Sequence, residues 1–340
     1  MRVLEKLALT LGCFVFVSCD GNSNEVETPV THPDESEKVQ AILLADPTIF
    51  VDEGRYYLYG TSSDKGFVTY SSSDLETWNG PCGNLDEGYV LSTETSFGKR
   101  WFWAPQVFKR NGKYYMAYCA ASTTNTASSQ IAIAEADSPL GPFQQETKSY
   151  LPASMQEIDP FVFVDDDGKI YIYHVREIDS NSIYVAQLND DMTEMDESTS
   201  TLCVKANTYS WENTANSSWP VAEGPTVVKH NGMYYLFYSV NDFRNVNYAV
   251  GYATASSPLG PWTKHPEPIL TRDMINENGP GHGDVFQDAD GQYYYVFHTH
   301  YSSTSVTPRK TAVVKLEWQN NGDVTIDASS FRYLSVSEEK

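Results

Sequence analysis

The chain has 340 residues, of which 45 are acidic and 23 basic, so its formal net charge is −22. A surface for nucleic acid or for an anionic membrane would have to work against this net field, and we therefore expect neither partner. The 23 tyrosines and 7 tryptophans suit the core of a β-rich protein and also the apolar faces of sugars.

Residues 1–18 are typical of a signal peptide. A basic start at Arg2 and Lys6 precedes the apolar run LALTLGCFVFV, which is too short to span a bilayer as a stable helix. Ser18 before Cys19 resembles the lipoprotein box of bacteria, in which the cysteine becomes the lipidated first residue.

Phe16 stands where such a box usually has leucine, and an ordinary signal peptide with an incidental cysteine is the alternative. Residues 19–40 are polar, acidic and proline-containing, which predicts a flexible tether. We therefore expect a secreted protein held at the outer membrane or cell surface by a lipid on Cys19, with no other membrane contact.

Five segments share one plan, in which a distinctive residue leads into an apolar strand, a turn glycine and a tyrosine-rich return strand. The turns are Glu53-Gly54, Asn111-Gly112, Asp167-Gly168, Asn231-Gly232 and Asp290-Gly291. Such dipeptides between alternating strands predict hairpins. Because the units recur about every 55 to 65 residues with three or four short strands each, they predict an all-β fold, a single five-bladed β-propeller over residues 41–336.

One residue of each unit takes a near-constant place before the turn glycine, nine positions before it in four units and eight in the first. These residues are Asp46, Trp103, Asp159, Glu223 and His282. In a propeller one end of every innermost strand opens on the same face, so we expect the five to occupy the same point of each unit and to converge. The alternative is that the Asp-Pro and Glu-Gly-Pro pieces are turn chemistry at the blade entrances.

Three carboxylates around one pit repel one another, so their pKa values must separate, which is what acid–base catalysis requires. Hydrolysis of a glycosidic bond uses one protonated carboxyl group and one carboxylate. The third carboxylate can hold the proton on the first. The sequence contains no nucleophile elbow, phosphate loop or dinucleotide fingerprint that would indicate another chemistry.

The chain resembles glycoside hydrolase family 43 over about residues 41 to 334. The resemblance rests on ADPTIF, WAPQV, IDPFVFVDDDG, EGPTVVKHNGMYYLFYS and GHGDVF, in this order. It implies a five-bladed propeller that removes arabinose, xylose or sometimes galactose units from plant polysaccharides with inversion of configuration. It also implies that Asp46 is the general base, Glu223 the general acid and Asp159 the carboxylate that tunes this acid.

A related clan that retains configuration carries a Trp-x-Asn-Asp-Pro-like segment and a Glu-Cys-Pro signature. Leu44-Ala45-Asp46-Pro47 and Glu223-Gly224-Pro225 fit the inverting group better. Gln106 follows Trp-Ala-Pro where the family commonly has aspartate, which puts a contact on the substrate side in doubt.

Trp103, His282 and Arg309 are expected to contact the substrate. Trp103 is expected to form a wall of the sugar pocket, with a core position as the alternative. Arg309 resembles an arginine that reaches sugar hydroxyls, and a plain surface charge is the alternative. His282 is either near a structural calcium or a neutral histidine of the core.

We therefore expect a monomeric, exo-acting glycosidase that binds an oligo- or polysaccharide and favours α-L-arabinofuranose. β-Xylosidase or galactosidase activity of the same fold is the first alternative, and a non-catalytic glycan-binding propeller is the second. No cofactor is expected apart from the calcium at His282. Cys82, Cys119 and Cys203 are expected to be free thiols, with one disulfide and a spare cysteine as the alternative.

Overall fold

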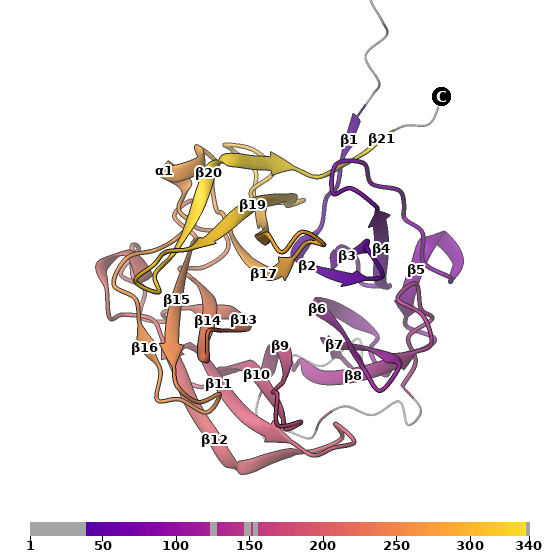
Figure 1. Ribbon diagram of the computed structural model, residues 1–340. Coiled ribbons are helices and arrows are strands. Elements are labelled where there is room, and N and C mark those ends of the chain that lie inside the picture. Colours follow the sequence, from indigo (N-terminus) through magenta and orange to yellow (C-terminus); the bar gives the residue numbers. More distant parts are fainter. Residues whose placement is uncertain (1–38, 123–127, 146–150, 152–155, 338–340) are drawn as a thin grey trace, which may run out of the picture. The chain divides into compact units, whose positions relative to one another are not determined.

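The computed structural model describes residues 39–122, 128–145, 151 and 156–337, all within the unit Lys38–Lys340. These residues form a five-bladed β-propeller, as predicted (Figure 1). The expected signal peptide and lipidation site, residues 1–18 and Cys19, lie outside the described residues. In the described part of the chain, no helix is long and apolar enough to cross a membrane.

Within the described residues, four blades are four-stranded antiparallel sheets and the second blade has three strands. Blade 1 contains β2 (Ala45–Asp52), β3 (Arg55–Thr61), β4 (Gly66–Ser72) and β5 (Tyr89–Ser92). Blade 2 contains β6 (Arg100–Arg110), β7 (Lys113–Ala121) and β8 (Gln130–Ala136). Blade 3 contains β9 (Glu157–Val164), β10 (Ile170–Glu177), β11 (Asn181–Leu188) and β12 (Met195–Lys205).

Blade 4 contains β13 (Ala222–His230), β14 (Met233–Val240), β15 (Ala249–Ala255) and β16 (Thr263–Lys264). Blade 5 contains β17 (Gly281–Gln287), β18 (Tyr293–Thr299), β19 (Lys310–Trp318) and β20 (Val324–Tyr333). The helical pieces are the short α1 (Arg272–Ile275) and the 3₁₀ turns η1 (Asp86–Gly88) and η2 (Ser210–Asn213). The innermost strands β2, β6, β9, β13 and β17 each contact the next one around the ring.

The hairpins that follow the innermost strands are confirmed, but their loops have two lengths. Blades 1, 2 and 4 have two-residue loops in which both residues have positive φ, for example 51° at Asn111 and 78° at Gly112. This conformation is the type I′ turn that asparagine and glycine favour. In blades 3 and 5 the loop is longer, because the last strand pairs are Val164 with Ile170 and Gln287 with Tyr293.

Every innermost strand contains a β-bulge near its start. At each bulge one residue has positive φ: Asp46 (49°), Ala104 (46°), Asp159 (55°), Gly224 (60°) and His282 (43°). Proline follows this residue in the first four blades and Gly283 in the fifth. Because proline has no N–H to give to the ladder, it fits a position where pairing is interrupted.

The bulges correct the register that the sequence predicted. Asp46, Asp159 and His282 occupy the bulge itself, but Trp103 and Glu223 precede it by one residue. The count from the turn glycine was wrong in blades 2 and 4 because their hairpin loops are shorter than those of blades 3 and 5. Trp103 and Glu223 therefore leave their strands at a different angle from the other three residues.

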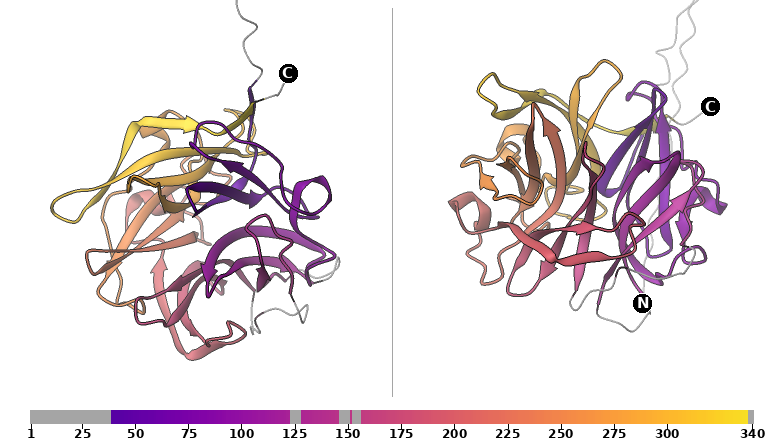
Figure 2. Two further views of the ribbon diagram at one scale, coloured as in Figure 1. Left: turned by 45° about the vertical axis from the view of Figure 1, so that its right-hand side comes forward. Right: turned by 60° about the horizontal axis from the view of Figure 1, so that its bottom comes forward.

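The ring closes between its two ends. β1 (Val39–Ala41) pairs with β21 (Ser335–Ser337), so the first and last strands lie side by side in both views (Figure 2). Two residues of the tether expected at 19–40, Val39 and Gln40, belong to this pair. Further in, the Thr311 hydroxyl bonds both the N–H and the carbonyl of Leu44, at 3.1 and 3.0 Å.

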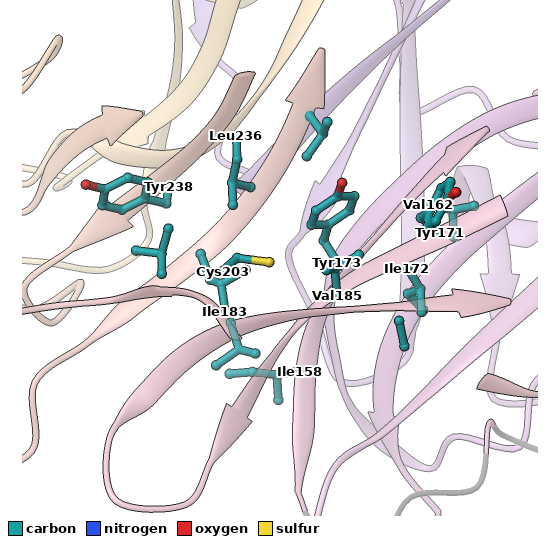
Figure 3. Close-up of a cluster of buried hydrophobic side chains, with 14 of the residues drawn as sticks. Ile158, Val162, Tyr171, Ile172, Tyr173, Ile183, Val185, Cys203, Leu236 and Tyr238 are labelled. Atoms are coloured by element: carbon teal, nitrogen blue, oxygen red, sulfur yellow. The ribbon is translucent and has the colours of Figure 1, made fainter. Parts of the chain in front are cut away.

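Apolar side chains fill the spaces between neighbouring blades. Figure 3 shows Tyr173 and Ile183 of blade 3 facing Leu236 of blade 4. Two similar motifs, SPLGPF and SPLGPW, lie in loops that tyrosines of the return strands contact. The Tyr173 hydroxyl donates to the Pro258 carbonyl of SPLGPW at 2.7 Å. In the same way, the Tyr59 hydroxyl donates to the Pro139 carbonyl of SPLGPF at 2.6 Å. The tyrosines of the return strands thus hold the loops of the following blade.

The three cysteines of the domain are free, as expected. Cys119 and Cys203 are buried, and Cys82 is partly buried. Burial raises the pKa of the Cys119 and Cys203 thiols, so both behave as small apolar core residues.

Candidate active site

The predicted site residues converge on one pocket of about 400 Å³. All six line it: Asp46, Trp103, Asp159, Glu223, His282 and Arg309. The other lining residues are Ile158, Glu177, Asn181, Trp219, Val221, Asp242, Phe243 and Arg244. Five of the six lie at or directly before the bulges of the innermost strands, and Arg309 directly precedes β19.

Asp46 is buried beneath three basic side chains. The Arg309 Nη1 lies 2.9 Å from the Asp46 Oδ1, and the Nδ1 atoms of His282 and His298 each lie 3.4 Å from it. Burial alone would raise the pKa of Asp46, but the charge of Arg309, together with the two histidines and a hydrogen bond from Thr61, outweighs it. The pKa of this carboxyl therefore lies well below its usual range, and Asp46 is ionised.

Glu223 has the opposite environment. Its Oε1 accepts a hydrogen bond from the Tyr248 hydroxyl at 2.8 Å, and its Oε2 accepts one from the Asn181 amide at 3.4 Å. Burial raises the pKa of Glu223 to about 7, and the charges of Asp46 and Asp242 act in the same direction. Glu223 therefore holds a proton in the acidic range and gives it up near neutrality.

Asp159 is tied to the backbone next to Glu223. Its Oδ2 accepts the N–H of Gly224 at 3.2 Å and lies 3.9 Å from the His282 Nδ1. Burial raises the pKa of Asp159 well above its usual value, and the neighbouring Glu223 and Asp46 raise it further. Because Asp159 and Glu223 interact, the two carboxyl groups titrate as a pair.

His282 lies between the carboxyl groups of Asp46 and Asp159, and burial lowers its pKa, which favours the neutral imidazole. Gly224 makes room for this ring, because a Cβ at Gly224 would lie 2.9 Å from the ring atoms Cγ and Cδ2. No group of three or more His, Cys, Asp or Glu side chains in the described residues could hold a metal ion. A calcium at His282 would therefore depend on backbone oxygens and waters, and it stays a prediction.

Trp103 and Arg309 each pack against an aromatic ring. Trp103 stacks on Trp101 with ring centroids 5.2 Å apart and an interplanar angle of 19°. The Arg309 guanidinium lies 4.7 Å from the centroid of the Phe243 ring. Arg309 is thus a pocket residue paired with Asp46, and not the surface charge considered as its alternative.

Gln106 has a structural position. Its side-chain amide donates to the Val162 carbonyl at 3.0 Å and accepts the Val162 N–H at 2.8 Å, which joins β6 to β9. Gln106 borders a small cavity of about 30 Å³ on the ring axis, which the five bulges also line. That volume is enough for a water molecule.

Sequence reasoning missed several residues of the site, of which His298, Tyr248, Asn181 and Trp219 contact it most directly. His298 could have been found by counting the hairpin register, because it pairs with Gly281, the neighbour of His282. Tyr248 is one of 23 tyrosines, and nothing in its local sequence distinguishes it. Asn181 reaches the pocket from the first position of β11, and Trp219 reaches it from the loop before β13, whose course no hydrophobic pattern predicts.

The chain is similar to several known proteins. A β-D-galactofuranosidase of Aspergillus niger is 26% identical over 299 residues, which cover 82% of this chain and 81% of that protein. An extracellular exo-α-(1→5)-L-arabinofuranosidase of Streptomyces avermitilis is 27% identical over 239 residues, or 65% of this chain and 48% of that protein.

Among solved structures, an endo-1,4-β-xylanase from Bacteroides thetaiotaomicron is 37% identical and has a TM-score of 0.79, over 89% of this chain and 100% of that one. The sequence profile of the glycosyl hydrolases family 43 matches residues 38–324. Since this match spans most of the chain and the fold is the same, the protein belongs to glycosyl hydrolases family 43.

Proposed function

We propose that the protein is an inverting glycoside hydrolase in which Asp46 is the general base, Glu223 the general acid and Asp159 the carboxylate that tunes the acid. One observation carries this assignment. Two carboxyl groups of the same pocket have pKa values displaced in opposite directions, well below the usual range for Asp46 and to about 7 for Glu223. One is therefore ionised while the other still holds a proton, which is the division of labour that glycoside hydrolysis needs.

The reaction follows from these two states. Asp46 takes a proton from a water molecule as the water oxygen attacks the anomeric carbon. Glu223 gives its proton to the glycosidic oxygen as the bond from that oxygen to the anomeric carbon breaks. Because Glu223 Oε1 is held by the Tyr248 hydroxyl, the transferred proton resides on Oε2. The products are a sugar of inverted configuration and an alcohol, and a proton passing from Asp46 through solvent to Glu223 completes the cycle.

For the substrate we favour a terminal pentose, α-L-arabinofuranose first, released one unit at a time. The volume of about 400 Å³ is near the small end of the range for ligand pockets, which supports recognition of one end sugar over a long run of backbone sugars. The arabinofuranosidase among the similar proteins supports the choice of sugar. β-Xylosidase or galactosidase activity is the alternative, supported by the similar xylanase and galactofuranosidase.

Hydrolysis of aryl α-L-arabinofuranoside, β-D-xyloside and galactosides tests the proposal, with NMR of the first-formed sugar. We expect cleavage, an inverted anomer and early release of single sugars from polysaccharide. A retained anomer contradicts the mechanism, and early release of mixed oligosaccharides contradicts the exo action. If the pure protein cleaves no aryl glycoside and no polysaccharide of a broad panel, but binds one of them, it is the glycan-binding propeller.

We also propose a lipid anchor on Cys19, a monomeric state and a calcium ion at His282. Cys19→Ala should move the protein from the membrane to the soluble fraction with its activity unchanged, and unchanged partitioning contradicts the anchor. A single species of one chain in sedimentation supports the monomer. Chelation should lower the melting temperature and added calcium should restore it, whereas an unchanged melting temperature contradicts the calcium.

A further inference from the structure

Trp219 exposes a large aromatic surface inside the pocket. Its side chain is 43% exposed although it lines the same cavity as Asp46 and Glu223. An exposed indole in a pocket offers apolar surface that a flat, partly apolar ligand can cover. A sugar ring is such a ligand.

The loop that carries Trp219 is held in place by its own hydrogen bonds. Ser217 Oγ accepts the Trp219 N–H at 3.1 Å and donates to the Trp219 carbonyl at 3.0 Å. Asn213 in turn holds Ser217 by accepting its N–H at 2.8 Å and donating to its carbonyl at 2.9 Å. Beyond Trp219, the carbonyl of Pro220 accepts the N–H of Asn181 at 3.1 Å. These hydrogen bonds hold the loop and the indole in one position before a ligand binds. Less conformational entropy is therefore lost on binding.

Trp219 is also connected to the carboxyl group of Glu223. Its Nε1–H donates to the Asn181 Oδ1 at 2.8 Å, and the Asn181 Nδ2 donates to the Glu223 Oε2 at 3.4 Å. The first bond sets which way the Asn181 amide faces, because an oxygen must accept the indole N–H. The amide nitrogen is then directed at the oxygen that carries the transferred proton.

Trp103 marks the other side of the pocket. It directly precedes Ala104, whose N–H donates to the Thr61 hydroxyl at 2.9 Å, and Thr61 in turn hydrogen-bonds Asp46. Trp103 is thus linked to the base through the backbone of its neighbour, and Trp219 is linked to the acid through Asn181. In an inverting displacement the attacking water and the leaving oxygen occupy opposite faces of the anomeric carbon, so the departing group lies on the acid side.

We infer that Trp219 is the platform for the leaving-group sugar and that Asn181 is a positioning residue that orients Glu223 toward the glycosidic oxygen. This assignment rests on the proposed function, since it takes Glu223 as the acid. The ligand class is the sugar on the reducing side of the bond that is cleaved.

Paired substrates test the inference. One is a short oligosaccharide of the sugar that the wild type cleaves, and the other is the glycosyl fluoride of the same sugar, whose leaving group occupies no sugar subsite and needs no protonation. Trp219→Ala should lower kcat/KM on the oligosaccharide about 10- to 100-fold and leave the fluoride within about twofold. Trp103→Ala should lower both, and Tyr301→Ala, which removes a 47% exposed ring outside the pocket lining, should lower neither.

Two milder variants separate the role of Trp219 as a sugar platform from the role of Asn181 in positioning Glu223. Trp219→Phe keeps an aromatic face but loses the N–H, so KM for the oligosaccharide should stay near the wild-type value while kcat falls. Asn181→Ala should show the same split, with kcat down about tenfold or more on the oligosaccharide and unchanged on the fluoride. Equal losses on both substrates in these variants overturn the positioning role of Asn181.

The two proposals fail differently. If Trp219→Ala loses equally on both substrates, or on neither, while the wild type is active on both, the platform is wrong and the proposed function stands. If the wild type cleaves no oligosaccharide and no glycosyl fluoride of any sugar tried, the proposed function is wrong. Calorimetric titration of the wild type and of Trp219→Ala with arabino- and xylo-oligosaccharides then still tests the indole. If the two proteins bind with the same affinity, or if neither binds, Trp219 is not a sugar platform.

Discussion

Arg309 and Asp46, 263 residues apart in the chain, form an ion pair with 2.9 Å between Nη1 and Oδ1 at the bottom of the pocket. The pair joins blade 5 to blade 1, next to the point where the ring closes. It also keeps a buried carboxylate ionised, which burial alone would oppose. The state of the proposed base therefore depends on a side chain from the neighbouring blade.

Arg309→Ala should raise the pKa of Asp46 and make the base harder to ionise. Because the base must be deprotonated, the acidic limb of the kcat/KM profile should move upward by about one to three pH units. Arg309→Lys, which keeps a positive charge, should move it less. An acidic limb in Arg309→Ala that coincides with that of the wild type contradicts the role given to this pair.

The pKa of about 7 at Glu223 predicts the alkaline limb. A general acid is active in its protonated form, so kcat/KM should fall tenfold per pH unit once the pH rises above this value. Burial is the main cause of the raised pKa, so the limb should appear with any glycoside that needs protonation. A profile that stays flat well above neutrality contradicts the assignment of Glu223.

Asp159→Asn removes the carboxyl group that titrates as a pair with Glu223 and leaves an oxygen that can still accept the Gly224 N–H. Glu223 should then lose its proton at lower pH, so the alkaline limb should move down. Asp242→Asn is the matched variant, since the charge of Asp242 also raises the pKa of Glu223, though less than that of Asp46. We expect a smaller movement in the same direction. An Asp159→Asn profile that stays in place contradicts the tuning role.

Asp284 links three blades through hydrogen bonds. Its carboxyl group accepts hydrogen bonds from the hydroxyls of Thr48 in blade 1 and Thr226 in blade 4, at 2.5 and 2.6 Å. Asp284→Ala leaves both donors without their acceptor, which should lower the free energy of unfolding by about 2 to 5 kcal/mol. Denaturant unfolding measures this loss, and Asp284→Asn should lose less. A change below about 0.5 kcal/mol shows that the three blades do not depend on this carboxyl group.

The fold and the main site residues could be predicted from local patterns. Each Asn-Gly or Asp-Gly turn determines a hairpin within a few residues, and five similar hairpins are enough to indicate the ring. The exact register could not be predicted, because two-residue and five-residue loops both place a glycine after an apolar strand. For this reason Trp103 and Glu223 were placed one residue away from their position relative to the bulge.

The partners of the site residues required the three-dimensional structure. Tyr248 and Asn181 contact Glu223 across 25 and 42 residues of chain, respectively. Neither contact follows from the hydrophobic period or from a turn motif of the sequence. The same holds for Asp284, which lies two residues after His282 in the GHGDVF motif and accepts two threonine hydroxyls from other blades.

A comparison of two substrates with different leaving groups most directly tests the assignment of Glu223 as the acid and Asp46 as the base. Glu223→Ala and Asp46→Ala are compared with the wild type on a natural glycoside, whose departing oxygen needs protonation, and on an activated aryl glycoside, whose oxygen does not. Glu223→Ala should lose about 10² to 10⁴ in rate on the natural glycoside and much less on the aryl glycoside, whereas Asp46→Ala should be severely impaired on both. Equal losses on the two substrates in both variants would contradict the assignment of acid and base.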